Sequence, residues 1–184
     1  MQQIFRETKS RIDFHKGPAI DFPAHIHDDI ELVYVKRGIG TAFCDGKKYI
    51  LTDDSWFLVF PNQVHHYADF EAGEYLVLIM KASDLLRFDR FFLKGVPVSA
   101  MCRVPGEEDE TLVYLLETAF REYARDGFND VIAAYLTAIF GKLIPFYSVE
   151  KTGFAQDSAL KILEYCANHY KEDLTVDLVA ENLS

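Results

Sequence analysis

One short segment, HIHDDIELVYVKRG, carries the side chains best suited to chemistry. His25, His27 and Glu31 all occupy odd positions, so on one extended strand they would point to the same face. Val33 and Val35 continue that face as an apolar wall. Two imidazoles and a carboxylate suit a borderline divalent metal, provided that a fourth ligand comes from elsewhere in the chain.

A fourth ligand could come from the segment PNQVHHY, which supplies His65 and His66. Either histidine could be that ligand.

These residues carry a resemblance to a known family. The pattern H-x-H-x3-E-x6-G, met by His25, His27, Glu31 and Gly38, resembles the first motif of the cupin superfamily, and SWFLVFPNQVH resembles the second. The form Pro-Asn-x-x-His resembles the sensor domains of AraC-type transcription regulators, and it favours His65 over His66. The resemblance implies a cupin-like barrel, a double-stranded β-helix.

Three roles stay open for His25, His27, Glu31 and His65. They could bind a divalent metal such as zinc, manganese or nickel, or they could recognise a small effector directly. They could also hydrogen-bond to one another and merely order the mouth of the barrel.

Aromatic side chains near this segment could stack on a sugar or an aromatic effector, because small barrels often leave room for one ligand. Aromatic residues are more often core residues, and we expect about three of the five candidates to be in the core. The five are Tyr34, Trp56, Phe57, Phe60 and Tyr67. Trp56 is the first candidate for the pocket. The effector site predicted from sequence comprises His25, His27, Glu31, Tyr34, Trp56, His65 and Tyr67.

Composition and charge exclude several functions. The 184 residues include 19 basic and 29 acidic side chains, and a net charge of −10 repels a phosphate backbone. Three cysteines without a pairing pattern indicate a reducing, cytoplasmic environment. No apolar run is long enough for a membrane span. Neither G-x-S-x-G nor a glycine-rich phosphate loop occurs, so we expect no enzyme.

Short apolar runs separated by turns predict an antiparallel β domain in the first hundred residues. Asp45-Gly46 is typical of a tight hairpin turn. The expected strands are residues 30–36, 41–44, 48–51, 56–60 and 75–80.

After Pro105 the apolar residues recur at helical spacing. The first expected helix carries the apolar residues from Leu112 to Tyr123 and stops at Gly127. Asn129 can cap a second helix that Pro145 breaks. This second helix is apolar on more than one face, which predicts a partner subunit and therefore a homodimer.

The segment ALKILEYCANHYKEDLTVDLVAENLS resembles the opening of an AraC-type DNA-binding domain. We expect one helix from Asp157 or Ser158 and another capped by Thr175, the first of a helix-turn-helix. A chain ending inside this helix indicates a truncated protein. The matching residues are Ile162, Tyr165, Tyr170, Leu174, Thr175 and Ala180.

Together these features predict a fold that is mainly β followed by α, in three parts. Residues 1–104 form a cupin-like effector-binding barrel, residues 105–150 a helical dimerisation unit, and residues 157–184 the incomplete start of a DNA-binding domain. The predicted function is effector sensing and dimerisation in an AraC-type regulator, with a small effector, a sugar being one candidate, and DNA bound only through the missing segment. The alternatives are a metal-dependent cupin enzyme, either a dioxygenase or an isomerase, and a plain sugar-binding module.

Overall fold

The computed structural model describes residues 5–6, 12–85, 88–92, 95–150, 161–162, 165–166, 169 and 174–183. The chain divides into two compact units, Met1–Glu150 and Lys151–Ser184.

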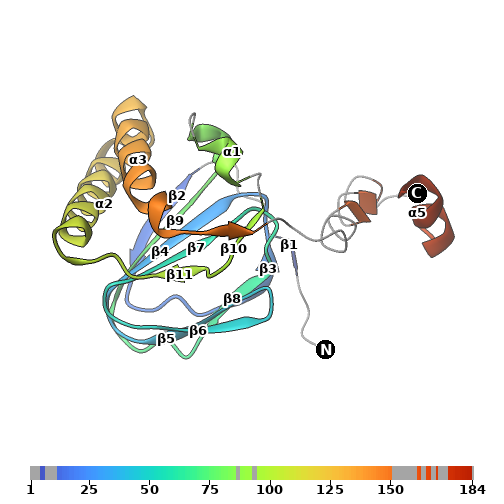
Figure 1. Ribbon diagram of the computed structural model, residues 1–184, viewed down its shortest axis with the longest axis horizontal. Helices are drawn as coiled ribbons and strands as arrows, with labels where there is room; N and C mark the ends of the chain where they lie inside the picture. The colour runs from blue at the N-terminus through green and yellow to red at the C-terminus, as the bar shows by residue number, and fades with distance from the viewer. Residues whose placement is uncertain are drawn as a thin grey trace. The chain divides into compact units, whose positions relative to one another are not determined.

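Two five-stranded sheets face each other in the first unit (Figure 1). Apart from the parallel pair of β1 with β3, their strands pair in antiparallel fashion. The first sheet has the order β11 (Met101–Cys102), β7 (Ser55–Val59), β4 (Ile30–Arg37), β9 (Glu74–Met80) and β2 (Asp13–Gly17). The second has the order β1 (Phe5–Arg6), β3 (Phe22–Ile26), β8 (His65–Ala68), β5 (Gly40–Cys44) and β6 (Lys47–Leu51).

This arrangement confirms the predicted class, mainly β followed by α. The sheets form a jelly-roll-like sandwich instead of one closed barrel, as the two separate strand orders show. A further two-stranded pair joins β10 (Val96–Pro97) to β12 (Val149–Glu150). The remaining short elements of this unit are η1 (Ala82–Asp84), α1 (Asp89–Phe92) and η2 (Ile144–Phe146).

Side chains alternate between two separate cores along the first sheet. Odd-numbered residues such as Val33 and Val77 face the second sheet, whereas even-numbered residues such as Leu32 and Leu78 face the helices. The sheet is therefore covered on both faces, as its nearly unbroken apolar strands require.

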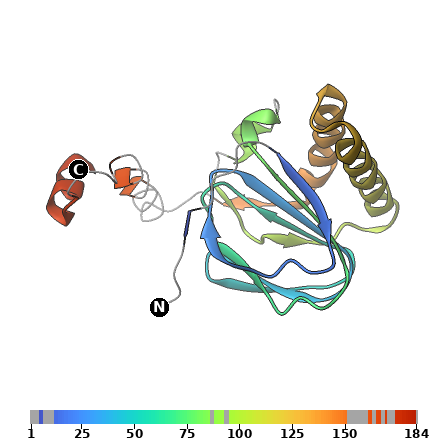
Figure 2. The same ribbon diagram turned by 180° about the vertical axis from the view of Figure 1, so that it is seen from behind.

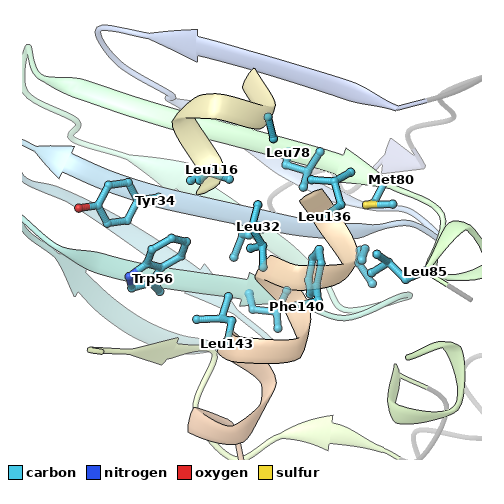
Figure 3. Close-up of a cluster of buried hydrophobic side chains, with 14 of the residues drawn as sticks. Leu32, Tyr34, Trp56, Leu78, Met80, Leu85, Leu116, Leu136, Phe140 and Leu143 are labelled. Carbon is cyan, nitrogen blue, oxygen red and sulfur yellow. The ribbon is translucent and has the colours of Figure 1, made fainter. Parts of the chain in front are cut away.

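Helices α2 (Gly106–Asp126) and α3 (Asp130–Leu143) lie side by side next to the first sheet (Figure 2). The apolar stripe of α2 and the more fully apolar α3 share one core with the sheet (Figure 3). Its buried helical members are Leu112, Leu116, Ala119, Ile132, Leu136, Ile139, Phe140 and Leu143.

Turn and cap residues behave as predicted. Asp45 and Gly46 have φ angles of 46° and 77° in the β5–β6 hairpin, and Gly127 has a φ of 67° at the end of α2. Pro145 lies in η2, directly after α3. The positive φ angles at Asp45, Gly46 and Gly127 are conformations that glycine and short polar residues adopt at low cost.

The side chain of Asn129 caps α3, accepting hydrogen bonds from the amides of Val131 at 3.0 Å and Ile132 at 3.1 Å. Replacing Asn129 by alanine should therefore lower the free energy of unfolding by about 1 kcal/mol. Urea denaturation followed by circular dichroism measures this loss. Asn129→Asp keeps the acceptor and should stay close to wild type, and equal losses in both variants would contradict the capping role.

The second unit contains α5 (Val176–Leu183), and the Thr175 hydroxyl accepts the amide hydrogen of Leu178 at 3.2 Å. The predicted cap at Thr175 is thus confirmed. The expected start of the preceding helix, Asp157 or Ser158, lies outside the described residues, although residues 161–162, 165–166 and 169 are helical. None of the helices in the described part of the chain has the length and apolar character needed to cross a bilayer.

Candidate functional site: a buried histidine and glutamate cluster beside a cavity

Three histidines and one glutamate converge between the two sheets. One ligand atom from each of His25, His27, Glu31 and His65 lies within 4.8 Å of all the others, and all four residues are buried. His25 pairs directly with His65 across β3 and β8. The convergence predicted from sequence is present.

The reason for this convergence differs from the sequence argument. One continuous strand was expected to carry positions 25, 27 and 31, but β3 ends at Ile26 and β4 begins at Ile30. The chain passes from the second sheet to the first at residues 27–29. The side chains therefore meet across the space between the sheets.

Backbone carbonyl groups orient all three imidazoles in the same way. Each ring places its Nδ1 within hydrogen-bonding distance of a nearby carbonyl oxygen, so Nδ1 carries the proton and Nε2 is left for the cluster. The distances are 2.9 Å from His25 to Pro23, 3.1 Å from His27 to Asp29 and 3.0 Å from His65 to Gln63.

Glu31 is the negative centre of the cluster. Its Oε2 lies 3.2 Å from Nε2 of His27 and 3.4 Å from Nε2 of His65, and its Oε1 accepts the Tyr67 hydroxyl hydrogen at 2.5 Å. Burial raises the pKa of Glu31, but the hydrogen bonds from these partners outweigh it and hold the pKa well below its usual range. Glu31 is therefore a carboxylate at neutral pH.

The imidazole of His27 complements this charge. Burial lowers its pKa, but the hydrogen bond and the charge of Glu31 have the larger combined effect and raise it above the ordinary value. Because Nδ1 donates to a carbonyl, Nε2 of His27 can face Oε2 of Glu31 favourably only with a proton or a metal ion between them.

His65 is positioned by the turn that precedes it. The Gln63 side chain accepts from the Phe60 amide at 2.9 Å and donates to Asp45 at 2.8 Å. The Val64 amide donates to the same Asp45 at 3.0 Å. The β5–β6 hairpin turn thus fixes the loop that presents His65.

His66 points away from the cluster. Its ring stacks on Phe43 at a centroid distance of 4.2 Å and an interplanar angle of 8°. Of the two histidines between which the sequence left a choice, only His65 belongs to the cluster.

The donor set fits a divalent metal. Three imidazole nitrogens and one carboxylate oxygen are the ligand types that zinc, manganese and nickel accept. The carbonyl groups behind the imidazoles and the Tyr67 hydroxyl behind Glu31 supply the outer hydrogen bonds that such sites require.

A cavity of about 240 Å³ adjoins the cluster. Within the cluster only His25 and Glu31 line it, so the cluster forms one wall of the cavity. Five of the lining residues come from the continuous stretch 15–22. The full lining is His15, Ala19, Ile20, Asp21, Phe22, His25, Glu31, Tyr67, Val77 and Ile79.

Two residues predicted for the effector site lie elsewhere. The rings of Tyr34 and Trp56 lie in the core between the first sheet and the helices, with centroids 4.4 Å apart and planes tilted by 35° (Figure 3). The Tyr34 hydroxyl donates a hydrogen bond to the Asp54 carboxylate at 3.1 Å, and the indole N–H of Trp56 donates one to the Asp109 carboxylate at 2.6 Å. This corrects the sequence prediction, because even-numbered positions on β4 and β7 face away from the cavity.

Most of the apolar wall of the cavity was not predicted from sequence. Val77 and Ile79 lie on β9 at alternate positions, and this alternation was the available signal. Residues 15–22 carried no signal for a cavity, because the sequence indicated only a strand or arm leading into the barrel.

Acid should weaken the fold through His25. Burial and the nearby His65 lower the pKa of His25 from 6.5 to about 4, so between these values the unfolded chain binds more protons. Above pH 6.5, His25 does not lower the free energy of unfolding. As the pH falls from 6.5 towards 4, the free energy of unfolding decreases by at most about 3 kcal/mol. Urea titrations across this pH range, with a chelator present, measure the free energy of unfolding. Its pH dependence should be shallower for His25→Asn than for the wild type. An unchanged slope would contradict the lowered pKa of His25.

The fold and site define a class, a two-sheet ligand-binding sandwich with a helical pair on one face. The family model for the AraC-like ligand binding domain matches residues 14–140, and the chain belongs to this family. The family model covers the cupin-like sandwich, α2 and most of α3, and the resemblance noted in the sequence is confirmed for this region.

Solved structures of AraC-type regulators have a similar fold. ToxT from Vibrio cholerae O395 bound to (E)-4-(8-methylnaphthalen-1-yl)but-3-enoic acid has a TM-score of 0.55 and 10% identity, over 95% of this chain and 72% of that one. Wild-type ToxT from Vibrio cholerae strain SCE256 bound to unsaturated fatty acid has a TM-score of 0.52 and 12% identity, over 96% and 70%.

The AraC-like transcriptional activator CuxR has a TM-score of 0.49 and 11% identity, over 85% of this chain. This chain spans 57% of CuxR. At such identities the likeness to these proteins concerns the fold alone. A comparison with curated protein sequences found no match.

Proposed function

We propose that this chain is the effector-sensing and dimerising part of an AraC-type transcription regulator, not an enzyme. A small molecule enters the cavity, and its binding changes how a helix-turn-helix domain, beginning within residues 157–184, is presented to DNA. The observation that carries the proposal is the cavity beside a buried polar cluster in a domain of this family.

The proposed effector site combines the cluster with the walls of the cavity. His25, Glu31 and Tyr67 supply polar atoms, and Val77 and Ile79 supply an apolar surface. Ligand sites commonly pair a few placed polar groups with such a surface. The bound organic acids of the ToxT structures support a small-molecule effector here, and a sugar remains a candidate.

We also propose that His25, His27, Glu31 and His65 can hold a zinc, manganese or nickel ion. A bound ion would supply a Lewis acid for an oxygen or nitrogen of the ligand. His25 and Glu31 line the cavity, and His27 and His65 would complete the set of residues that hold the ion.

The outer faces of α2 and α3 are the proposed dimer surface. Tyr114 on α2 is 66% exposed and Val131 on α3 is 56% exposed, on helices that bury other residues in the core shared with the first sheet. Sedimentation at tens of micromolar should show a dimer, and Val131→Glu should weaken it. A monomeric wild-type protein would contradict dimerisation.

The charge of the chain argues against DNA contacts made by its sensing and dimerising parts. With 29 acidic against 19 basic residues, the chain as a whole repels the phosphate backbone. The proposed division assigns sensing to residues 1–104, dimerisation to residues 105–150 and the start of a DNA-binding domain to residues 157–184.

A metal-dependent enzyme, such as a dioxygenase or isomerase, is the second candidate, and the buried ligand set favours it. An enzyme would convert the compound that it binds, whereas a sensor would release it unchanged. Mass spectrometry of the compound after incubation with the metal-loaded protein separates these functions.

Effector binding can be tested by thermal melting with fractions of a small-molecule extract from the source cells. A fraction that contains the effector should raise the melting temperature, because a ligand bound to the folded state stabilises it. Val77→Phe fills the cavity and should abolish the rise, whereas Ile50→Phe, at a site 48% exposed on β6, should not. A rise that persists in Val77→Phe would contradict the proposed site.

A further inference from the structure

The chain crosses from β3 to β4 through residues 27–29, and this connection carries His27. The imidazole Nδ1 of His27 donates to the backbone carbonyl of Asp29 at 3.1 Å, and Nε2 lies 3.2 Å from Glu31. The backbone carbonyl of His27 accepts the Asn62 amide hydrogen at 2.7 Å. The orientation of the ring therefore depends on where the backbone of Asp29 lies.

Asp29 places a carboxylate in a buried position. Its Oδ1 lies 3.1 Å from Nζ of Lys81, and the same ammonium group lies 2.9 Å from the more exposed Asp28. Its Oδ2 has no hydrogen-bond partner in the described part of the chain. A buried carboxylate needs a partner of opposite charge, so we expect the Lys81 ammonium group to hold the Asp29 side chain in place.

The backbone of Lys81 is held on both sides. Met80 before it ends β9 and pairs with Ile30, the first residue of β4. The Lys81 carbonyl accepts the Asp84 amide hydrogen at 3.1 Å, and η1 then leads to Leu85, which is fully buried in the core shared with the helices. A contact from a fixed backbone restrains its partner well, because less conformational entropy is lost when the contact forms.

We propose that Lys81 is a positioning residue for the cluster and that it acts through Asp29 on His27. The ion pair holds the β3–β4 connection in the conformation in which the Asp29 carbonyl accepts the His27 Nδ1 hydrogen. Without the ammonium group, the Asp29 carboxylate would turn outward to reach water, and the carbonyl of the same residue would move with it. The consequence for metal binding rests on the proposed metal site, whereas the effect on the His27 ring does not.

Lys81→Met removes the charge and keeps most of the aliphatic chain. Competition titration with zinc and a chromophoric chelator should show an affinity about tenfold below wild type, because outer-shell partners of a metal site contribute roughly 10–100-fold. Lys81→Arg should restore most of the affinity. Lys36→Met is the matched control, because the Lys36 side chain is 40% exposed and that of Lys81 41%. Its ion pairs join β4 to Glu74 and Glu117, so zinc affinity should be unchanged.

A second measurement needs no metal. After dialysis against a chelator, NMR spectroscopy of the histidine ring nitrogens should show that the His27 Nδ1 hydrogen exchanges slowly with water, because it is buried and bonded to Asp29. Lys81→Met should accelerate this exchange severalfold, whereas Lys81→Arg and Lys36→Met should not. The His65 Nδ1 hydrogen, bonded to the Gln63 carbonyl, is the internal reference and should exchange at the wild-type rate in all variants.

A double-mutant cycle tests whether Lys81 acts through Asp29, because such cycles isolate the interaction between two groups. Adding Lys81→Met to Asp29→Asn should change the His27 exchange no further. Adding it to Asp28→Asn should have the full effect.

Unchanged His27 exchange in Lys81→Met would overturn the proposal. An equal acceleration at His65, or in Lys36→Met, would overturn it as well, because the effect would then be a general loosening of the fold. Wild-type protein that binds no zinc would contradict the proposed metal site instead, and the His27 exchange rates would still decide the role of Lys81.

Discussion

Replacing His65 by alanine should lower the affinity for a divalent metal by more than about a hundredfold, because loss of an outer-shell partner alone costs roughly 10–100-fold. His65 is fully buried, and its Nε2 lies 3.4 Å from Glu31. The variant removes one of four ligands from the predicted set. Competition titration with a chromophoric chelator measures the affinity for zinc, manganese and nickel.

The neighbouring histidine provides the matched control. His66→Ala removes an imidazole one position away that stacks on Phe43 outside the cluster, so metal affinity should be unchanged. Equal losses in both variants would contradict the ligand assignment. Wild-type protein that binds none of the three metals would leave the cluster as a hydrogen-bonded network around Glu31.

Replacing Phe140 by alanine should lower the free energy of unfolding by about 3–5 kcal/mol. Phe140 is fully buried in the core shared by α3 and the first sheet, with its ring 5.9 Å from Phe92. Because helices and sheet share this core, urea denaturation should remain a single transition for Met1–Glu150.

Phe146→Ala is the matched control for this loss, because Phe146 is 36% exposed in η2. It should cost less than about 1 kcal/mol. A small loss in Phe140→Ala, or separate transitions for sheet and helices, would show that the helical pair folds apart from the sandwich.

Local signals in the sequence predicted much of the fold. A turn or a helix end can be predicted without tertiary information where one residue determines it through its own backbone or side chain. This holds for Asp45-Gly46, Gly127 and Asn129. The same holds for Thr175 before α5. The β and α regions and several element ends follow from such residues.

Tertiary placement was harder to predict. His25 and Glu31 meet because two sheets face each other, not because they share a strand. The alternation of side chains along a strand already places Tyr34 on the face opposite Glu31. Tyr34 was nevertheless assigned to the effector site, because aromatic side chains often contact ligands. Trp56 needed the register of β7 against β4, which pairs it with Tyr34. The cavity wall formed by residues 15–22 depends on the packing of the two sheets, which no local pattern encodes.

Methyl NMR spectroscopy can decide whether the effector binds between the two sheets, with the extract fraction that stabilises the protein added to the full chain. We expect shifts and ligand contacts at the methyl groups of Ile20, Val77 and Ile79, which line the cavity. Ile132 and Ile139, buried in the helical core, should show no ligand contacts. Contacts confined to those helical methyl groups, with Val77 and Ile79 unaffected, would contradict an effector site between the sheets.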